Sequence, residues 1–288
     1  MDEQTRRQAI DLYDRFTHDG LERREFMARM VAIAGSAAAA EALIAGIAAS
    51  SAAAAIVPAN DKRLTTRTLT FASPTGYRAY LAEPRTRSLK ATVIVIHENR
   101  GLNEHVRDVA RRLALAGYRA VAPDFLSPAG GTPANEETAR EMIGKLDLAK
   151  ATAAGVAMLN ELAKSSRAGK AGAVGFCWGG AYVNRLAVAA GAALDAGVAY
   201  YGPAPNPAEA AKVQAPLLLH YAGLDERVNA TGRPWAAALQ KAGKPVASFV
   251  YEGVNHAFNN DTSAERYNKA AAELAWQRTL AFLGRHLR

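Results

Sequence analysis

The chain contains a single cysteine among its 288 residues, so no internal disulfide can form. This absence excludes a disulfide-held scaffold, and it leaves the redox compartment undecided. Glycine and proline, with 23 and 12 residues, are too few for a chain that is disordered throughout. Half of the residues are hydrophobic, which is enough to bury one large core or at most two.

Aspartate and glutamate, 27 in all, are fewer than the 35 lysines and arginines, which gives a net charge of +8 and an isoelectric point of about 9.6. Such a balance can serve nucleic-acid binding. The lysines and arginines are scattered, however, and the sequence has no zinc-finger spacing, RNP-like aromatic motif or basic tail. We therefore expect a solvated basic surface that attracts anionic small molecules, and no nucleic-acid partner.

Residues 1–57 differ in composition from the rest of the chain. Arg23 and Arg24 are followed by a long Ala-rich apolar segment that ends in small residues. This order is typical of a twin-arginine export signal, with Ala-x-Ala-type cleavage near Ala53 to Ala55. The protein would then be periplasmic or exported further, and otherwise cytoplasmic.

The same residues also fit a retained helical arm. The stretch before the arginine pair is long and rich in acids, and Glu41 interrupts the apolar segment, which also disfavours a membrane span. Apolar residues recur at helical spacing at Ile10, Tyr13 and Phe16. Asp19 and Glu22 resemble a capping box that opens a second helix. Such an arm could pack on a second copy of the chain and form a homo-oligomer.

From residue 63 onward, strand and helix patterns alternate. We expect helices over 105–118, 135–164 (in two pieces), 178–191, 234–243 and 263–287. The expected strands are 63–73, 77–84, 91–97, 118–125, 171–177, 196–202, 216–223 and 246–253. This order predicts an α/β fold: one domain, residues 58–288, with a mostly parallel doubly wound sheet and an antiparallel N-terminal edge.

The one cysteine lies in AVGFCWGG, where an expected strand meets an expected helix. Gly175 and Gly179 flank Cys177 at two residues' distance, which is the G-x-nucleophile-x-G elbow with cysteine in place of serine. Backbone N–H groups at the start of the helix favour a thiolate there. A lone cysteine is usually a small buried hydrophobe, but the coincidence of frame, strand and helix favours a catalytic nucleophile.

A thiol nucleophile needs a base, and the base needs an acid that orients it. In a doubly wound hydrolase these follow in the order nucleophile, acid, histidine. Asp225 follows an expected strand, with Glu226 as a neighbouring rival, and His256 follows the next strand. We set the other histidines aside because of their places in the chain: His18 in the N-terminal segment, His105 at a helix start, His220 within a strand and His286 at the chain end.

The segment after the first buried strand completes the predicted site. Folds of this kind place the second donor to the oxyanion there, so we expect the backbone N–H groups of Asn99 and Trp178 to stabilise the tetrahedral intermediate. Glu98 lies in the same segment, where a carboxylate beside a thiolate is unexpected.

Together these residues resemble the dienelactone hydrolase family, an α/β-hydrolase branch with a cysteine nucleophile. The resemblance runs from about residue 63 to the end and includes the elbow and the His256-Ala257-Phe258 motif. It implies Cys177 as nucleophile, His256 as base, Asp225 as orienting acid and Glu98 as the carboxylate that contacts the resting thiol. It implies hydrolysis of cyclic enol esters in the degradation of aromatic compounds, and no cofactor or metal.

Two departures leave alternatives open. Asn259 and Asn260 stand where the family carries an arginine that holds the substrate carboxylate, and Arg100 could substitute for it or be a surface residue. The export-like segment favours a carboxylesterase of broader specificity. A non-catalytic assembly module and a redox-sensing thiol are the competing readings.

Overall fold

The computed structural model describes residues 2–48, 55–85, 89–165 and 169–287. These residues form an eight-stranded sheet in the order β1-β2-β4-β3-β5-β6-β7-β8. The strands are β1 (Leu64–Thr70), β2 (Arg78–Pro84), β3 (Thr92–Ile96), β4 (Arg119–Asp124), β5 (Ala171–Phe176), β6 (Ala196–Tyr200), β7 (Leu217–Ala222) and β8 (Val246–Tyr251). β1 and β2 pair in antiparallel fashion, as do β2 and β4, and the remaining pairs are parallel. The expected mostly parallel sheet with an antiparallel edge is confirmed.

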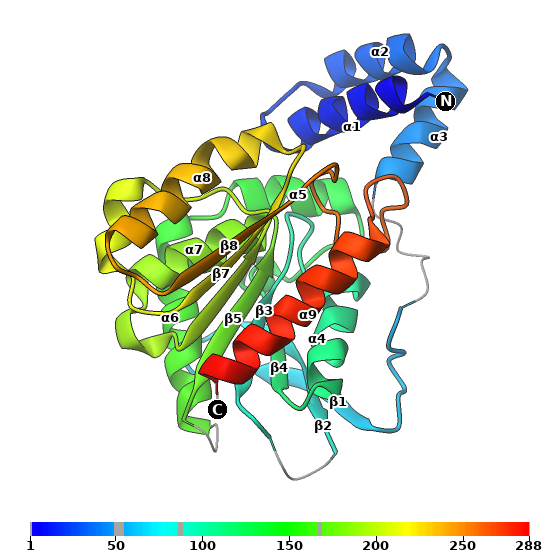
Figure 1. Cartoon of the computed structure of the whole chain (residues 1–288). Helices are drawn as coiled ribbons and strands as arrows, with labels where there is room; N and C mark the ends of the chain where they lie inside the picture. The colour runs from blue at the N-terminus through cyan, green and yellow to red at the C-terminus, as the bar shows by residue number, and fades with distance from the viewer. Residues whose placement is uncertain (1, 49–54, 86–88, 166–168, 288) are drawn as a thin grey trace.

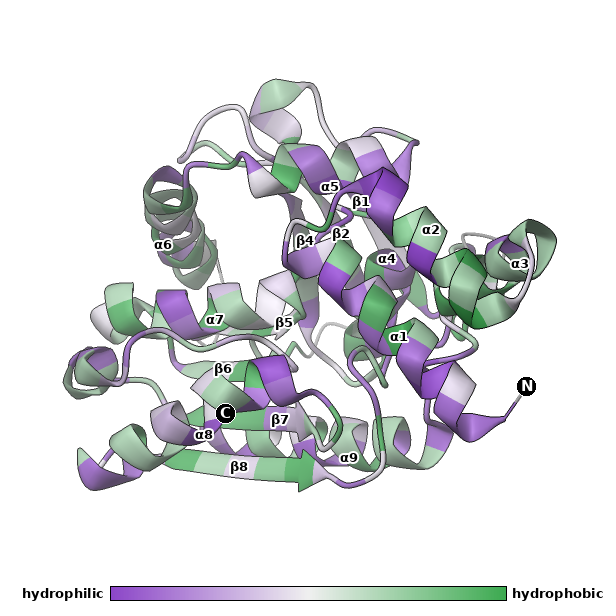
Figure 2. Cartoon of the chain, turned by 90° about the horizontal axis from the view of Figure 1, so that it is seen from above, coloured by the Kyte–Doolittle hydropathy of each residue, from purple (hydrophilic) through white to green (hydrophobic). Residues whose placement is uncertain are grey.

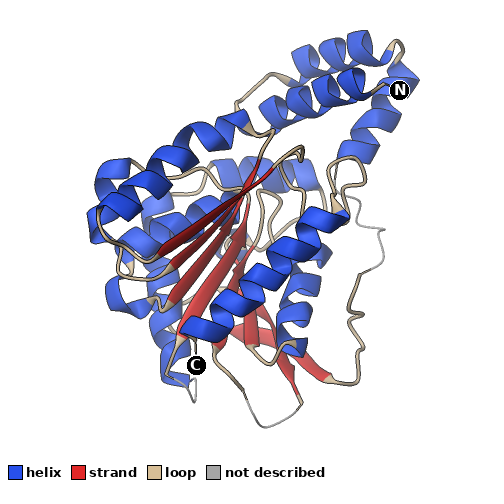
Figure 3. Cartoon of the chain, viewed as in Figure 1, coloured by secondary structure: helices blue, strands red, loops and turns tan. Residues whose placement is uncertain are grey.

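Helices cover both faces of the sheet (Figures 1 and 3). α4 (Glu104–Leu115) and α9 (Lys269–His286) share one apolar cluster with Val93 and Val95 of β3. α6 (Leu148–Ser165), α7 (Trp178–Ala189) and α8 (Glu226–Lys241) share the other cluster with Ile94 and Ile96. Alternate residues of a strand point to opposite faces, so the continuous apolar run of β3 supplies both cores.

Shorter helical elements lie in the connections between the strands and the longer helices. α5 (Glu136–Gly144) begins after Asn135, whose side chain accepts a hydrogen bond from the backbone N–H of Thr138. Three short 3₁₀ turns complete the described helices: η1 (Ser127–Ala129), η2 (Gly191–Ala193) and η3 (Pro207–Lys212).

Two helix starts differ from the sequence prediction. α8 begins at Glu226 and not at Pro234, because the Asp225 side chain caps it by accepting from the N–H of Val228. α9 begins at Lys269 and not at Ser263, because Asn268 caps it. In both cases a local side-chain hydrogen bond fixed the boundary.

The N-terminal residues form a three-helix arm of α1 (Glu3–His18), α2 (Arg23–Ala34) and α3 (Ala37–Ile47). We use "the arm" for residues 2–48. The predicted capping box is wrong: Asp19 ends α1 as its C-cap, and the Glu22 side chain makes no cap hydrogen bond. No single helix of the described residues is long and apolar enough to cross a membrane, although α2 and α3, bent by 104°, pass on length and composition when taken together.

The arm has an apolar cluster of its own and rests on one end of the body. The buried members of that cluster all come from the arm, at Ala9, Ile10, Leu12, Tyr13, Phe16, Phe26, Met30, Ala40, Leu43 and Ile47. Seen from above, α1 lies over one end of the body, beside the place where β5 meets α7 (Figure 2), and its last residue, His18, contacts Cys177 there. The arm therefore lies over the edge where the sequence places the site.

Candidate active site

Cys177 occupies a strained turn between β5 and α7. Its backbone angles are φ 53° and ψ −113°, a conformation that residues other than glycine rarely adopt. A Cβ on Gly175 would lie 2.1 Å from the carbonyl oxygen of Gly179, and a Cβ on Gly179 would lie 2.3 Å from that of Ile96. Neither contact is possible, so the chain can close this turn only with glycines on both sides.

His256 and Asp225 meet through loops at the ends of neighbouring strands. The Nδ1 atom of His256 lies 2.5 Å from Oδ2 of Asp225, and both side chains are buried. Asp225 follows β7 and His256 follows β8, so the parallel pairing of these strands brings the two loops together. Glu226, the rival acid, begins α8 and has no hydrogen bond to His256 among the described interactions.

The electrostatics of this pair favour a protonated imidazole. Burial opposes the positive charge, but the Asp225 carboxylate and the sulfur of Cys177 outweigh it and raise the pKa of His256 to about 10. Burial likewise acts to raise the pKa of Asp225, and His256 more than offsets this, so that the pKa of the acid is lowered. His256 can therefore take up a proton beside Cys177.

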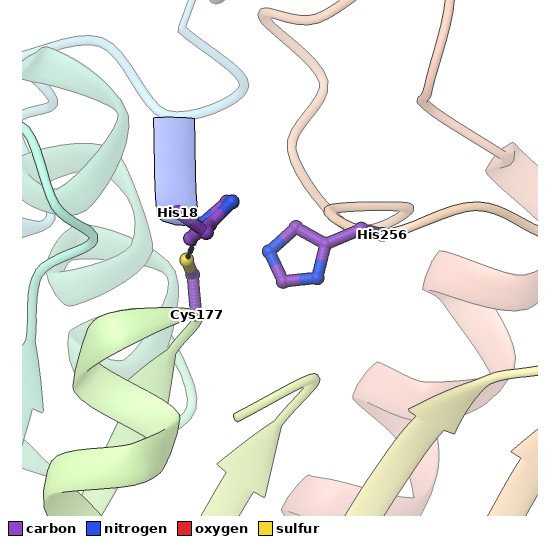
Figure 4. Close-up of side chains that lie close together, drawn as sticks. All are labelled: His18, Cys177 and His256. Carbon is purple, nitrogen blue, oxygen red and sulfur yellow. Dashed lines mark hydrogen bonds between the residues drawn. The ribbon is translucent and has the colours of Figure 1, made fainter. Parts of the chain in front are cut away.

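His18 is also part of the site, and setting it aside was wrong. Its Nε2 atom lies 3.2 Å from Sγ of Cys177 (Figure 4). One ring nitrogen of His18, one of His256 and the sulfur lie within 4.8 Å of one another. No sequence pattern indicates this contact, because His18 lies 159 residues before Cys177, at the end of a helix outside the body.

Glu98 has other partners than the resemblance implies. Its Oε2 accepts a hydrogen bond of 2.9 Å from Nδ2 of Asn260, and Oε1 lies 3.5 Å from the Tyr201 hydroxyl. Glu98 lines the same small cavity as Cys177. The hydrogen bond of the thiol, however, goes to His18. Glu98 thus ties the loop after β3 to the loop that follows His256.

The two predicted oxyanion donors both lie near Cys177. Trp178 is the first residue of α7, so its N–H belongs to the donors that a helix start leaves outside the helix. Asn99 lies in the loop after β3 and lines the cavity with Cys177. Its side-chain Nδ2 donates to the carbonyl of Thr17 in the arm over 3.4 Å.

Two arginines line the cavity, and both are engaged by the arm. Arg100 pairs with Glu136 and donates to the Tyr13 hydroxyl, so in this form it presents no free guanidinium to a substrate. Arg266 lies 3.3 Å from Oδ1 of Asp14. The sequence analysis did not single out Arg266, which precedes α9 and reaches the site only through the fold.

The space beside Cys177 is very small. The cavity that Cys177, His256 and His18 line has a volume of about 10 Å³. One water molecule needs about 10–15 Å³, and sites for small organic ligands usually have about 300–1,000 Å³. No ester therefore fits beside Cys177 while α1 is in this position.

Comparison with known proteins finds relatives that all point to one family. Residues 77–287 match the family described as "Dienelactone hydrolase family". A protein of Saccharolobus solfataricus named "Putative carboxymethylenebutenolidase" is 33% identical over 245 residues, which cover 72% of this chain and 93% of that protein.

Solved structures have the same fold. One titled "Putative Dienelactone Hydrolase", from Klebsiella pneumoniae, has a TM-score of 0.65 and 28% identity and covers 76% of this chain and 98% of its own. A dienelactone hydrolase from Anabaena variabilis, at 20% identity and a TM-score of 0.61, covers 78% of this chain and 100% of its own and supports the fold alone.

Proposed function

Because the chain belongs to the dienelactone hydrolase family, we propose that it hydrolyses carboxylic esters or lactones with Cys177 as nucleophile, His256 as general base and Asp225 as orienting acid. The observation that carries this proposal is the strained Cys177 turn beside a buried imidazole that is held at 2.5 Å by a carboxylate. This is the set of roles that covalent acyl transfer requires.

The reaction proceeds in two halves. His256 takes the proton of the Cys177 thiol, and the sulfur attacks the carbonyl carbon. The tetrahedral intermediate then expels an alcohol or enol oxygen, which receives that proton, and an acyl-thioester remains. A water molecule gives a proton to His256 and attacks the thioester, so that the carboxylic acid leaves and the thiol is restored. No cofactor or metal takes part.

The backbone N–H groups of Trp178 and Asn99 stabilise the oxyanion in both halves. Trp178 contributes from the first turn of α7, where the helix dipole adds to the effect. Removing one such donor typically costs about 100-fold or more in rate.

The substrate we propose is a small anionic ester or lactone. Arg100 and Arg266 line the cavity beside Cys177. Arg266 can bind a substrate carboxylate once Asp14 of the arm no longer holds it, whereas Arg100 keeps its pair with Glu136 of the body and can do so only by sharing its guanidinium. Such substrates include the cyclic enol esters of aromatic-compound degradation. The alternative is a carboxylesterase of broader specificity that takes neutral esters equally well.

We propose further that the protein is exported. The arginine pair stays exposed on α2, where a receptor can reach it. Of the expected cleavage site, Ala53 and Ala54 lie outside the described residues. Replacing both Arg23 and Arg24 by lysine should keep the protein in the cytoplasm, and mass spectrometry of the exported form should find an N-terminus near residue 55. Association through the arm stays a prediction, which size measurement of the full chain tests.

The hydrolase proposal is tested by ester turnover in the full chain and in its Cys177→Ala variant. A panel should compare dienelactone, as an anionic lactone, with neutral p-nitrophenyl esters. We expect turnover only with the thiol present, and a preference for the anion. Equal turnover with and without the thiol would remove the proposal, and equal rates on both substrate classes would favour the broader esterase.

A further inference from the structure

We propose that the arm is a removable cap: it slows hydrolysis by seating His18 on the Cys177 thiol, and an ester reaches the sulfur only in the fraction of molecules whose α1 has left the site. This inference rests on the proposed function for its consequence, but the seating itself can be tested without any turnover. Three observations carry it: the hydrogen bonding of His18, the space left beside the sulfur and the nature of the contact between arm and body.

The hydrogen bonds of His18 fix which ring nitrogen carries the proton. Nδ1 lies 2.9 Å from the carbonyl oxygen of Asp14, which can only accept, and 2.9 Å from the Thr17 hydroxyl, which itself donates to the carbonyl of Tyr13, so Nδ1 is the donor. Nε2 is then an acceptor, and the Cys177 thiol donates to it. The proton is thereby directed to His18 instead of to the base.

The arm also fills the place of a substrate. Tyr13, Thr17 and His18 line the cavity of about 10 Å³ around Cys177, which has no room for an ester. The Tyr13 hydroxyl accepts from Arg100, and the Asp14 carboxylate pairs with Arg266. α1 therefore covers the nucleophile and both cavity arginines together.

The interface between the arm and the body is polar, so the arm can dissociate without exposing a hydrophobic core to solvent. The apolar clusters of the body contain no arm residue, and that of the arm contains no body residue. Arg6 pairs with Glu265 at 2.7 Å, and the Ser263 hydroxyl donates to the carbonyl of Ile47. A cleft of about 260 Å³ between α1 and the strand-end loops reaches His256. Polar interfaces of this kind favour relative motion.

Alkylation of Cys177 by iodoacetamide, followed by mass spectrometry, tests the cap directly. The chain has one cysteine, so the label reports one site. Arg6→Glu places a second negative charge beside Glu265 and substitutes no residue of the active site. We expect it to raise the alkylation rate and ester turnover about tenfold. Adding Glu265→Arg restores an opposite pair and should return both rates toward those of the unaltered chain.

The outcomes separate the cap from the hydrolase. Faster alkylation in Arg6→Glu, reversed by the charge swap, supports the cap even where no ester is turned over. Equal alkylation rates in all three proteins would overturn it, even where esters are turned over well. Thermal melts of the variants verify that the body stays folded, so that a change in alkylation rate reports the arm.

A different observation carries a second inference: we infer that His18, Cys177 and His256 bind Zn²⁺ while the arm is seated. Both imidazoles have Nδ1 engaged, in His256 with the Asp225 carboxylate and in His18 with a backbone carbonyl. Metal-binding histidines are anchored in this way, which leaves Nε2 for the ion. Among the described residues, Nε2 of His256 is buried and lacks a hydrogen-bond partner (Figure 4).

The three ligand atoms are of the types that bind zinc, and a zinc ion bound there would inhibit the enzyme. A thiolate and two imidazoles are typical zinc ligands, at about 2.3 Å from sulfur and about 2.0–2.1 Å from nitrogen. The donors lie within 4.8 Å of one another, so small shifts close the site. Binding releases two protons to solvent, that of the Cys177 thiol and that on Nε2 of the His256 imidazolium, and leaves the sulfur and both Nε2 atoms as ligands. The ion then occupies nucleophile and base together, which blocks hydrolysis.

Titration with Co²⁺ alone tests this site, because a bond between Co²⁺ and the Cys177 thiolate gives an absorption band that can be followed as the ion is added. We expect one equivalent to bind the unaltered chain, His18→Ala to bind at least about tenfold more weakly, and Cys177→Ala to show no thiolate band. His286→Asn, at the chain end, is the matched control and should bind as the unaltered chain does. Absence of the band, or equal affinity in His18→Ala, would overturn the inference whether or not esters are hydrolysed.

Discussion

Asp225 holds His256 by a hydrogen bond of 2.5 Å between Oδ2 and Nδ1, while its Oδ1 accepts the N–H of Val228 at the start of α8. One carboxylate thus orients the imidazole of His256 and caps a helix. The two roles belong to different oxygens, so a substitution can remove one and keep the other.

Asp225→Asn should lower kcat by about 100- to 10,000-fold without loss of stability. An amide can donate to Nδ1 and so favours the tautomer in which Nε2 carries the proton and cannot accept one from Cys177. Asparagine caps helices as well as aspartate does. Kinetics and urea unfolding measure the two effects. Glu226→Gln is the matched control and should keep full activity, whereas a larger loss there would assign the acid to Glu226.

Gly179→Ala should destabilise the fold by at least about 3 kcal/mol, because its Cβ would lie 2.3 Å from the Ile96 carbonyl oxygen and the strand cannot retreat. The free energy of unfolding in urea measures this. Gly144→Ala is the control, because a Cβ there meets nothing within 4 Å. Similar stabilities of the two variants would contradict the close packing of the elbow.

Glu98→Ala should cost about 1–3 kcal/mol of stability, because it leaves the buried Nδ2 of Asn260 without its acceptor. The exposed Glu273 makes only a long ion pair of 3.9 Å, so Glu273→Ala should change stability by less than about 0.5 kcal/mol. Chemical unfolding of both variants measures the difference. A neutral effect at Glu98 would mean that this carboxylate does not hold the two loops together.

Stability should fall as the pH drops below 6.5, partly because of His220. Burial lowers the pKa of His220 to about 3 from its ordinary value of 6.5. Only the unfolded chain then takes up this proton between those values, so the contribution is full above pH 6.5 and is lost toward pH 3. The slope is about 1.4 kcal/mol per pH unit for one such group.

Urea unfolding at pH 7 and pH 5 measures this loss. The ring of His220 lies between the Tyr251 hydroxyl at 2.9 Å and the Thr279 hydroxyl at 3.2 Å. Glutamine can serve both partners and does not titrate, so His220→Gln should lose less stability on acidification than the unaltered chain. Parallel losses in the two proteins would show that His220 takes up its proton in the folded state.

Local sequence patterns determined the body of this protein. The continuous apolar run of β3 and the helical spacing of α4 each follow from which faces must be buried, so order and layers could be predicted. The strand-to-helix turn at Cys177 could also be predicted from the sequence, because it excludes every residue except glycine at positions 175 and 179. Chain order alone then identified Asp225 and His256.

Only the tertiary structure decided what covers the site. His18 and Arg266 reach Cys177 through the docking of a separately packed arm, and contacts across such distances leave no periodicity in the sequence. The partners of Glu98 were likewise set by where two loops meet. A sequence records the residues that a strand, helix or turn needs locally, whereas the neighbour of a side chain across a polar interface depends on how whole elements pack.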